Sequence, residues 1–429
     1  MSEVSEGSSE SPRGRGRVRR AFAGWHVVAG AFISQALSAG LCFNPFGVFL
    51  LPVAESFGSS VGTVSAGLTI GMVVMAVVGP LVGRAADHGP IRAVMVAGIA
   101  MLGLGLHLAA RSEALWQAGL AFCALMSVGA AMTGPIPTVT VVGNWFVRRR
   151  GIALGITVAG ATLASMAAPG VGEWLIAAEG WRSALRTMGN LAFLLGVPAL
   201  WWLIAGRPSD LGQQADGGVS GEAPTASTPH VPPVSLRDPR VWLVSLGFAF
   251  LFASPVVMTV HLPGYLSDLG IGRAGVFFAA MGPLSLLSKV VFGAVADRVD
   301  PRYALYAAIA VLGLSWVLVL FVPLDGRLWL AGAVFGFGVG AVGPLQGIVT
   351  AACFGRGAVG RVMGYTSLLG LPLVAGSPWF VGVLFDLQGS YRTGLLIMTS
   401  TLLVSALIFA SIRIPEVEPG TEGEAAQNG

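Results

Sequence analysis

The chain has 429 residues, of which 54% are hydrophobic and only 11% are charged, and its formal net charge is +4. Soluble domains carry about 25% charged residues, so this composition excludes an ordinary soluble protein and indicates an all-α polytopic membrane protein. The net charge does not indicate nucleic-acid binding, because the arginines concentrate in short connections between apolar runs, as they do in membrane proteins. The three cysteines lie in apolar runs without metal-ligand spacing, so we expect neither a metal site nor disulfides.

The first 24 residues are polar and carry five arginines ahead of the first apolar run. We expect this basic tail to hold the amino terminus on the cytoplasmic side of the membrane. Binding to lipid headgroups is an alternative role for the same arginines.

Twelve apolar runs follow, each bounded by charged residues or turn residues. A helix needs about 20 apolar residues to cross the core of a bilayer, so each run is long enough for one span. The predicted spans are 25–53, 61–83, 91–110, 115–143, 151–176, 184–205, 241–263, 274–296, 303–323, 328–352, 361–384 and 393–413.

One stretch, 206–238, divides these spans into six and six. It is rich in Gly, Pro, Ser and Thr and lacks aromatic residues, which indicates a cytoplasmic and largely disordered linker. The predicted organisation is a basic tail (1–24), an amino-terminal half (25–205), the linker (206–238), a carboxyl-terminal half (239–413) and a polar tail (414–429).

The distribution of arginine predicts the orientation. With the amino terminus inside, eighteen arginines fall on the cytoplasmic side and six on the other side. This bias favours an even number of spans with both termini in the cytoplasm. We expect the protein to lie in the cell membrane. The six arginines on the outer side are Arg111, Arg182, Arg186, Arg273, Arg327 and Arg392.

Several spans contain a residue pair that interrupts helices. Asn44 precedes Pro45 in the first span, and Gly-Pro pairs stand at 134–135, 282–283 and 343–344. Proline removes a helical hydrogen bond, and irregular backbone at membrane depth is tolerated where it lines a cavity, so we expect breaks at these points. Four polar residues of these spans are candidates to line a substrate cavity, with helix–helix hydrogen bonding as the alternative: Asn44, Thr133, Gln346 and Tyr365.

The two halves repeat each other at an offset near 210 residues. The tract 83–92 returns as 293–302, with its glycine, aspartate and arginine each 210 positions on, and Gly172 and Arg182 recur at the same offset. A two-fold repeat about an axis along the membrane normal is typical of one major class of transporters, whose substrate site lies near the midplane between the halves. The repeated charges could instead serve only topology, but we expect them to close the cytoplasmic side: Asp87, Arg92, Asp297 and Arg302.

Lys289 is the only lysine in the chain, and it lies inside the eighth apolar run. A charge at membrane depth costs on the order of 3 kcal/mol on insertion scales and marks a functional site by default. The alternative, that the side chain snorkels to the interface, is strained because Asp297 lies about 12 Å further along a helix. We therefore expect Lys289 to bind an anionic ligand, and we hypothesise that it can also release a proton.

The tract 83–92 resembles the signature that links spans two and three in the major facilitator superfamily: Gly, three residues, Asp, then Gly and basic residues. Here Gly89 comes one position early. Further tracts are similar to the monocarboxylate-transporter-like and oxalate/formate-type branch of that superfamily. They are Asn144-Trp-Phe-Val-Arg-Arg-Arg-Gly, Gly180-Trp-Arg, Gly206-Arg-Pro-Ser-Asp-Leu-Gly, His261-Leu-Pro and Asp386 followed by Gly-Ser-Tyr391.

The resemblance covers about residues 22–413 and implies the major facilitator fold, with twelve transmembrane helices in two pseudo-symmetric six-helix halves. In that branch a basic residue of span eight, four before the glycine of the second loop motif, binds the substrate carboxylate. Lys289 holds that position, four before Gly293. Eukaryotic members have arginine there and an aspartate one turn earlier, where this chain has Ser285, so it departs from their proton-relay scheme.

The expected function is alternating-access transport of a small organic anion, most simply a monocarboxylate, by proton symport or by exchange against another anion. His261 at the end of span seven and Glu173 in span five are candidate proton-linked residues. No P-loop, nucleophile–base pair or metal cluster stands out, so we expect no ATP drive, no cofactor and no enzymatic activity. Two alternatives remain, efflux of a drug or natural product through the same fold and a non-transporting membrane sensor.

Overall fold

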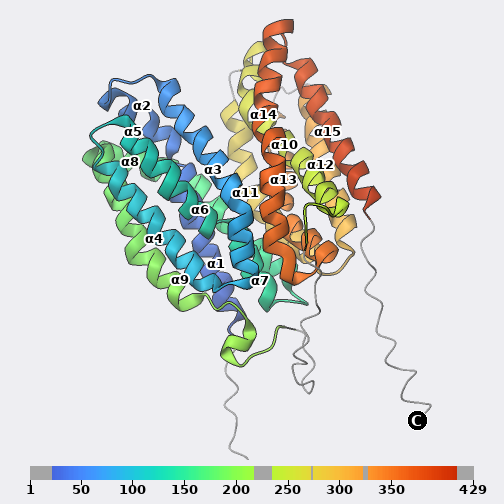
Figure 1. Ribbon diagram of the computed structural model, residues 1–429. Coiled ribbons are helices and arrows are strands. Elements are labelled where there is room, and N and C mark those ends of the chain that lie inside the picture. Colours follow the sequence, from blue (N-terminus) through green and yellow to red (C-terminus); the bar gives the residue numbers. More distant parts are fainter. Residues whose placement is uncertain (1–21, 217–233, 272–273, 322–326, 413–429) are drawn as a thin grey trace, which may run out of the picture.

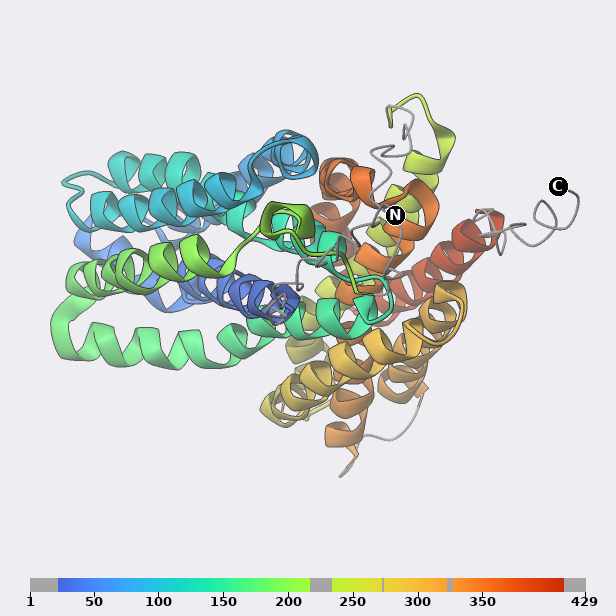
Figure 2. The same cartoon turned by 90° about the horizontal axis from the view of Figure 1, so that it is seen from below.

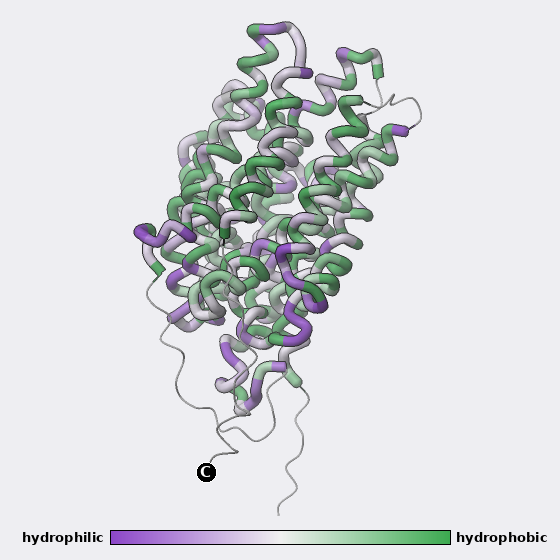
Figure 3. The backbone as a smooth tube through the Cα atoms, turned by 90° about the vertical axis from the view of Figure 1, so that its right-hand side faces the viewer, coloured by the Kyte–Doolittle hydropathy of each residue, from purple (hydrophilic) through white to green (hydrophobic). Residues whose placement is uncertain are grey.

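The computed structural model describes residues 22–216, 234–271, 274–321 and 327–412, and these residues are almost entirely helical, without a strand. The basic tail, the centre of the predicted linker and the acidic tail lie outside the described residues. Eleven helical stretches are long and apolar enough to cross a membrane. The hydrophobic residues form the middle of the molecule, and hydrophilic residues gather toward its ends (Figure 3).

The amino-terminal half contains the first six spans. Three of its spans include a π-helical turn, labelled η1, η2 and η3. Its elements are α1 (Gly24–Ser38), η1 (Ala39–Phe43), α2 (Phe46–Ser56), α3 (Val61–His88), α4 (Ile91–Ala110), α5 (Leu115–Leu120), η2 (Ala121–Met126), α6 (Ser127–Thr133), α7 (Pro135–Trp145), α8 (Arg150–Leu191), η3 (Ala192–Gly196) and α9 (Val197–Leu203).

The carboxyl-terminal half contains six spans made of longer uninterrupted helices. A 3-10 turn, η4 (Pro208–Leu211), precedes this half in the chain, and a second one, η5 (Arg356–Ala358), lies within it. Its helices are α10 (Pro239–Asp268), α11 (Ala274–Ala296), α12 (Pro301–Phe321), α13 (Leu328–Phe354), α14 (Val359–Gln388) and α15 (Arg392–Ser411).

The stretch Arg150–Leu203 contains two spans and not one. It has 54 residues, which is about 80 Å of helix, whereas the hydrocarbon core of a bilayer is about 30 Å thick. Gly180 interrupts it with a φ of 77° and a ψ of 160°, a conformation that favours glycine. The helix reverses at this residue, so the eleven stretches correspond to the twelve predicted spans.

The two halves form two bundles that stand side by side (Figures 1 and 2). α1 begins at the lower end of Figure 1 and α15 runs down toward this end, which we call the terminal face. The ends of α3 and α11 and the beginnings of α8 and α14 meet at this face, and the other end of the molecule is the opposite face. Contacts of α3 with α14 and of α8 with α11 join the two halves.

Two of the four predicted helix breaks are present. α2 begins after Pro45, and Gly134 separates α6 from α7 with an extended ψ of −153°. The breaks predicted at 282–283 and 343–344 were wrong, because α11 and α13 continue through Pro283 and Pro344. A membrane helix tolerates the missing hydrogen bond of a proline when close neighbours compensate for it, and α11 and α13 pack closely along their length.

The first part of the predicted disordered linker is in fact packed against the amino-terminal half. Residues 206–216 cross the terminal face, where Gln213 Oε1 accepts a hydrogen bond from the backbone N–H of Ala23 at 2.9 Å. The backbone N–H of Asp216 donates to the carbonyl of Trp145 at 3.1 Å. We call these eleven residues the strap. The strap therefore forms hydrogen bonds with the amino-terminal half that its composition alone did not predict.

Candidate functional site

Lys289 lies on α11 where the two halves meet. Its side chain is only 7% exposed. A methyl group added to Gly155 of α8 would collide with the Lys289 carbonyl, so the backbones of α8 and α11 touch at this position. Small residues permit such contact between membrane helices.

α13 holds the other side of α11 in place. Methyl groups added to Gly332, Gly336 or Gly340 would collide with the α11 backbone at Phe277, Met281 and Ser285, respectively. These glycines are four apart and therefore form one face of α13. The hydroxyl of Ser288, next to Lys289, donates a hydrogen bond to the Phe337 carbonyl of α13. Lys289 is thus carried by a helix that is packed on two sides.

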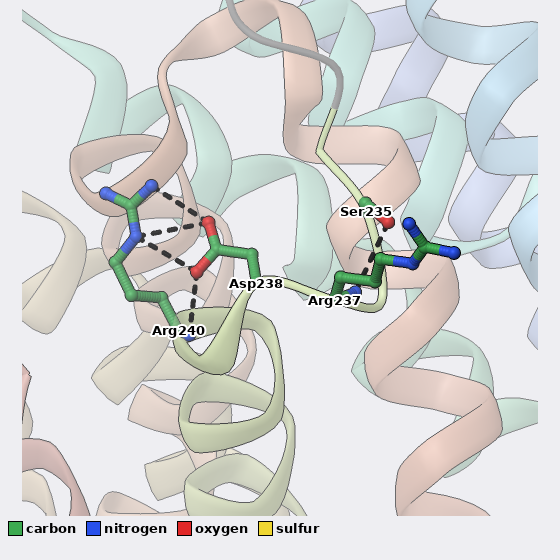
Figure 4. A network of polar contacts seen from close by, with 4 residues as sticks. All are labelled: Ser235, Arg237, Asp238 and Arg240. Atoms are coloured by element: carbon green, nitrogen blue, oxygen red, sulfur yellow. Dashed lines mark hydrogen bonds and ion pairs between the residues drawn. The ribbon is translucent and has the colours of Figure 1, made fainter.

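The ammonium group of Lys289 has no hydrogen bond and no ion pair with any residue that the structure describes. By contrast, Asp238 and Arg240 at the start of α10 form an ion pair at 2.9 Å (Figure 4). The hydrogen bond from Arg240 lowers the pKa of the Asp238 carboxyl. A buried cation without a protein partner is a candidate site for an anion from outside the protein.

Asp87 closes one contact between the halves. Its carboxylate, at the end of α3, accepts hydrogen bonds from the backbone N–H groups of Gly360 and Arg361 at 2.8 Å each. These residues belong to the first turn of α14, where N–H groups lack helical partners and the helix dipole favours a negative charge. Asp87 is 9% exposed. We call this contact the Asp87 junction.

Asp297 closes the equivalent contact on the other side of the pseudo-symmetry axis. Its carboxylate, after the end of α11, accepts hydrogen bonds from the backbone N–H groups of Gly151 at 2.5 Å and Ile152 at 3.0 Å in the first turn of α8. Burial raises the pKa of the Asp297 carboxyl, although the two hydrogen bonds act in the opposite direction. We call this contact the Asp297 junction.

Paired glycines bring the backbones together at both junctions. A methyl group on Gly83 would collide with Gly360, and one on Gly151 would collide with Gly293. Toward the opposite face, a methyl group on Gly170 of α8 would meet no other atom within 4 Å. The same is true of Gly376 on α14. The backbone contact between the halves is therefore concentrated at the terminal face.

The two arginines of the repeated motif lie beside these junctions. Arg92 Nε donates a hydrogen bond to the Ile204 carbonyl at 2.5 Å, which ties the start of α4 to the end of α9 within one half. Arg302 is half-buried at the start of α12, where it lines a small cavity with Tyr306 and Cys353. The junction aspartates bind helix N-termini, a partner that the sequence did not reveal.

The four polar candidates for the cavity lining are dispersed. Asn44 Nδ2 donates to Ser165 Oγ of α8 at 2.8 Å, and the Thr133 hydroxyl donates to the Gly129 carbonyl within its own helix at 2.8 Å. Gln346 on α13 and Tyr365 on α14 are half-buried and have no hydrogen bond to a described residue. No hydrogen bond between described residues links any of the four to Lys289.

The two proton-linked candidates lie elsewhere. His261 on α10 has its Nε2 2.9 Å from the Pro378 carbonyl of α14, and its ring centroid is 5.5 Å from that of Tyr391. Glu173 is exposed on α8. Neither residue contacts Lys289 through a hydrogen bond in the described part of the chain.

The strap adds a carboxylate that sequence reasoning missed. Asp216 accepts hydrogen bonds from three successive backbone N–H groups, those of Val147, Arg148 and Arg149, and the last two are 3.2 and 3.1 Å long. These residues directly precede α8, and Asp216 is close enough to Asp297 to raise the pKa of that carboxyl further. An isolated aspartate in a Gly-rich stretch gives no sequence signal for such a role.

A family model described as Major Facilitator Superfamily matches residues 31–375. The chain is 28% identical over 403 residues to Monocarboxylate transporter 13 of Bos taurus, which covers 91% of this chain and 89% of that protein. It is 27% identical over 416 residues to Monocarboxylate transporter 11 of Homo sapiens, and the alignment covers 92% of this chain and 84% of that protein. It is also 27% identical over 281 residues to the MFS-type transporter pytF of Aspergillus terreus, covering 65% and 90%.

Solved structures share the fold. The human organic anion transporter MFSD10 superposes with a TM-score of 0.67 at 17% identity, covering 90% of this chain and 99% of that chain. A bacterial homologue of the iron transporter ferroportin in its outward-facing state superposes with a TM-score of 0.64 at 16% identity, covering 90% and 98%. At these identities the likeness concerns the fold alone.

Proposed function

The chain belongs to the major facilitator superfamily, and we propose that it carries a small organic anion across the membrane by alternating access. It is a multi-pass membrane transporter and not an enzyme. A monocarboxylate is the substrate class that we favour, because relatives aligned over about nine-tenths of the chain are named monocarboxylate transporters. The partners in this proposal are the lipid bilayer, the anion, and protons or a counter-anion.

Lys289 is the observation that carries the proposal. A carboxylate that enters between the halves would supply the negative partner that this cation lacks among the described residues, and charge-assisted hydrogen bonds are the strong ones. Because α8 of one half and α11 of the other touch at Lys289, an anion there would contact both halves. The lining residues that we propose around it are Asn44, Thr133, Gln346 and Tyr365.

The closed terminal face supports alternating access. We propose that this face is cytoplasmic, since it receives the larger share of the arginines in the connections between spans, and that both termini are cytoplasmic. The conformation described here is then outward-facing. To face inward, Asp87 and Asp297 would release the N-termini of α14 and α8, while Arg92 and Arg302 hold the adjoining helix ends in place.

The driving force is proton symport or exchange against a second anion. Ser285 stands one turn before Lys289 and packs against Gly340, so no carboxylate lies beside the lysine on that turn. His261 and Glu173 are the proton-linked candidates. The pH dependence of uptake separates the two modes, because exchange against an internal anion does not require a proton gradient.

The test is counterflow in proteoliposomes with labelled mono- and dicarboxylates. Wild type should accumulate a labelled monocarboxylate. Lys289→Gln should reduce the rate of uptake about 100-fold or more, because a buried charged contact is lost. Lys289→Arg should keep part of the activity. Each variant is checked for folding by its thermal unfolding. Equal rates for wild type and Lys289→Gln would reject the anion site. No uptake of any acid by folded wild type would favour efflux of another compound or a sensor.

A further inference from the structure

A cavity of about 450 Å³ lies inside the amino-terminal half, near the opposite face and apart from Lys289. It is bordered by residues of η1, α2, α3, α4, α5, η2 and α8. Its floor consists of buried side chains, among them Phe49, Phe122 and Met126. Protein interiors are close-packed, and ligand pockets measure about 300–1,000 Å³, so this cavity has the size of a ligand site and not of a packing defect.

Two π-helical turns shape its wall. η1 contributes Leu41 and Cys42, and η2 contributes Phe122, Cys123 and Met126. Single π turns within α-helices are rare and occur frequently at functional sites. Residues of both turns line the same cavity.

The chemistry of the lining is apolar. None of the 23 lining residues is charged. The indole N–H of Trp181 already donates to Ser56 Oγ at 2.8 Å, and Cys123 Sγ lies 3.7 Å from the Gly67 carbonyl. An anion would lose its hydration here without gaining a partner, so the cavity excludes the proposed substrate and favours an uncharged, apolar ligand.

The mouth of the cavity lies beside an exposed apolar face of α3. Its rim includes Ile70 of α3, which is 52% exposed. Ile70 continues along one face of α3 into Val73, Val77 and Leu81, which are 41%, 55% and 69% exposed. Leu81 lies at the level where Gly83 touches Gly360 and the halves are closed, so this exposed face points outward and not between the halves.

The other side of the rim leads to the same medium. Trp116 of α5 lines the cavity and is 69% exposed, and Leu120, one turn further along the same face, is 59% exposed. Within a membrane-spanning bundle, two exposed apolar faces that flank one opening are covered by hydrocarbon chains. Lipid acyl chains are therefore the molecules that we expect at this mouth.

We propose that this cavity is a lipid site, in which one acyl chain from the leaflet at the opposite face inserts between α3 and α5 down to Phe122. The site is independent of the anion at Lys289. It places a lipid chain against α3, the helix whose other end forms the Asp87 junction.

Two glycines allow the cavity to be filled without disturbing its walls. Gly67 and Gly119 both line it, and a methyl group on either would meet no other atom within 4 Å. Gly119→Leu and Gly67→Leu fill the space from α5 and from α3, respectively. Gly313→Leu on α12 is the matched control, because Gly313 also faces open space but lies outside the cavity.

The test uses vesicles that contain a phosphatidylcholine with a photoactivatable diazirine in the middle of one acyl chain. After irradiation, the labelled peptides are identified by mass spectrometry. We expect labelling of the buried floor at Phe49, Phe122 and Met126 as well as of the exposed Trp116. In each cavity variant that folds, labelling of the floor residues should fall about tenfold, which corresponds to about 1.4 kcal/mol in binding. Labelling of Trp116 should not change in these variants. Gly313→Leu should show the wild-type labelling of the floor.

Two results would overturn the proposal. One is labelling confined to the exposed faces in wild type, which would mean that the chain does not enter. The other is floor labelling that persists at the wild-type level in both folded cavity variants, which would mean that the label reaches these residues by another route.

Discussion

The Asp87 junction and the Asp297 junction repeat one design. In each, a carboxylate at the end of one helix accepts two hydrogen bonds from the first turn of a helix in the other half, and a pair of glycines brings the backbones together. The two junctions close the same face of the molecule. The repeat in the sequence thus corresponds to a repeated contact in the structure.

The difference between the junctions lies one turn deeper. At the Asp87 junction Gly79 packs against Gly364, so both partners are glycine. At the offset of 210 residues the counterpart of Gly79 is Lys289, which packs against Gly155. One junction therefore closes the protein, whereas the other closes it and also carries the charge. We infer that closure depends on both junctions and that anion binding depends on one.

Among substitutions that leave Lys289 in place, the largest effect is expected from filling the backbone contact at the charged junction. Gly151→Leu would drive a side chain into Gly293, and overpacking of this kind costs about 1–3 kcal/mol, so the terminal face should fail to close. A cost near the upper end of this range corresponds to a fall in the counterflow rate of about 100-fold. Gly170→Leu on the same helix faces open space and serves as control. A wild-type rate for Gly151→Leu would show that closure does not use this contact.

The aspartate variants compare the two junctions directly. Asp87→Asn and Asp297→Asn each replace one accepting carboxylate oxygen by an NH2 group that cannot accept a backbone N–H, and hydrogen bonds to a charged group contribute about 1.5–3 kcal/mol. Both variants should open the terminal face, and Asp87→Asn should do so more because Asp87 is the more buried carboxylate. Spin labels at Arg84 and Arg298, in a background without the native cysteines, report the distance between the halves. An unchanged distance distribution in both variants would contradict a role in closure.

The Asp297 junction should also respond to pH. Burial raises the pKa of the Asp297 carboxyl in the closed state. The closed state therefore binds the proton more tightly than a state in which this carboxyl is hydrated. Low pH should favour closure, and this preference should be lost as pH rises through the raised pKa. The same spin labels measured across pH test this, and Asp297→Asn should reduce the response. A response that stays undiminished in Asp297→Asn would assign the proton to another group.

The smallest effect is expected at the strap. Asp216→Asn weakens the hydrogen bonds to Val147, Arg148 and Arg149, just before α8. Hydrogen exchange at these amides should become about tenfold faster, since a charged hydrogen bond contributes at least about 1.5 kcal/mol. The amides of Gly360 and Arg361 at the Asp87 junction provide the internal comparison and should not change. Equal acceleration at both places would mean global loosening.

Local patterns in the sequence predicted most of the fold. Apolar length was sufficient to predict the twelve spans, and Pro45 and Pro135 marked two real breaks, because span length and proline geometry are local properties. Pro283 and Pro344 did not break their helices, since packing between α11 and α13 overrides the local preference. Whether a proline interrupts a membrane helix depends on neighbours that are distant in the sequence.

The candidate site was predictable in its charges but not in its contacts. A single lysine in an apolar run identifies Lys289 without any structure. The partners of Asp87 lie more than 270 residues away, and backbone N–H groups carry no residue-type signal. The strap and the lipid-facing cavity likewise arise from tertiary packing, so no sequence pattern announces them.

The most direct test of the account is equilibrium binding of a labelled monocarboxylate to the purified protein. Wild type, Lys289→Gln and Lys289→Arg are compared, and Gly79→Ala, at the symmetry-related position, controls for packing. We predict that binding is lost in Lys289→Gln and kept within about tenfold in Lys289→Arg and Gly79→Ala. Wild-type affinity in Lys289→Gln would contradict the claim that this junction carries the anion.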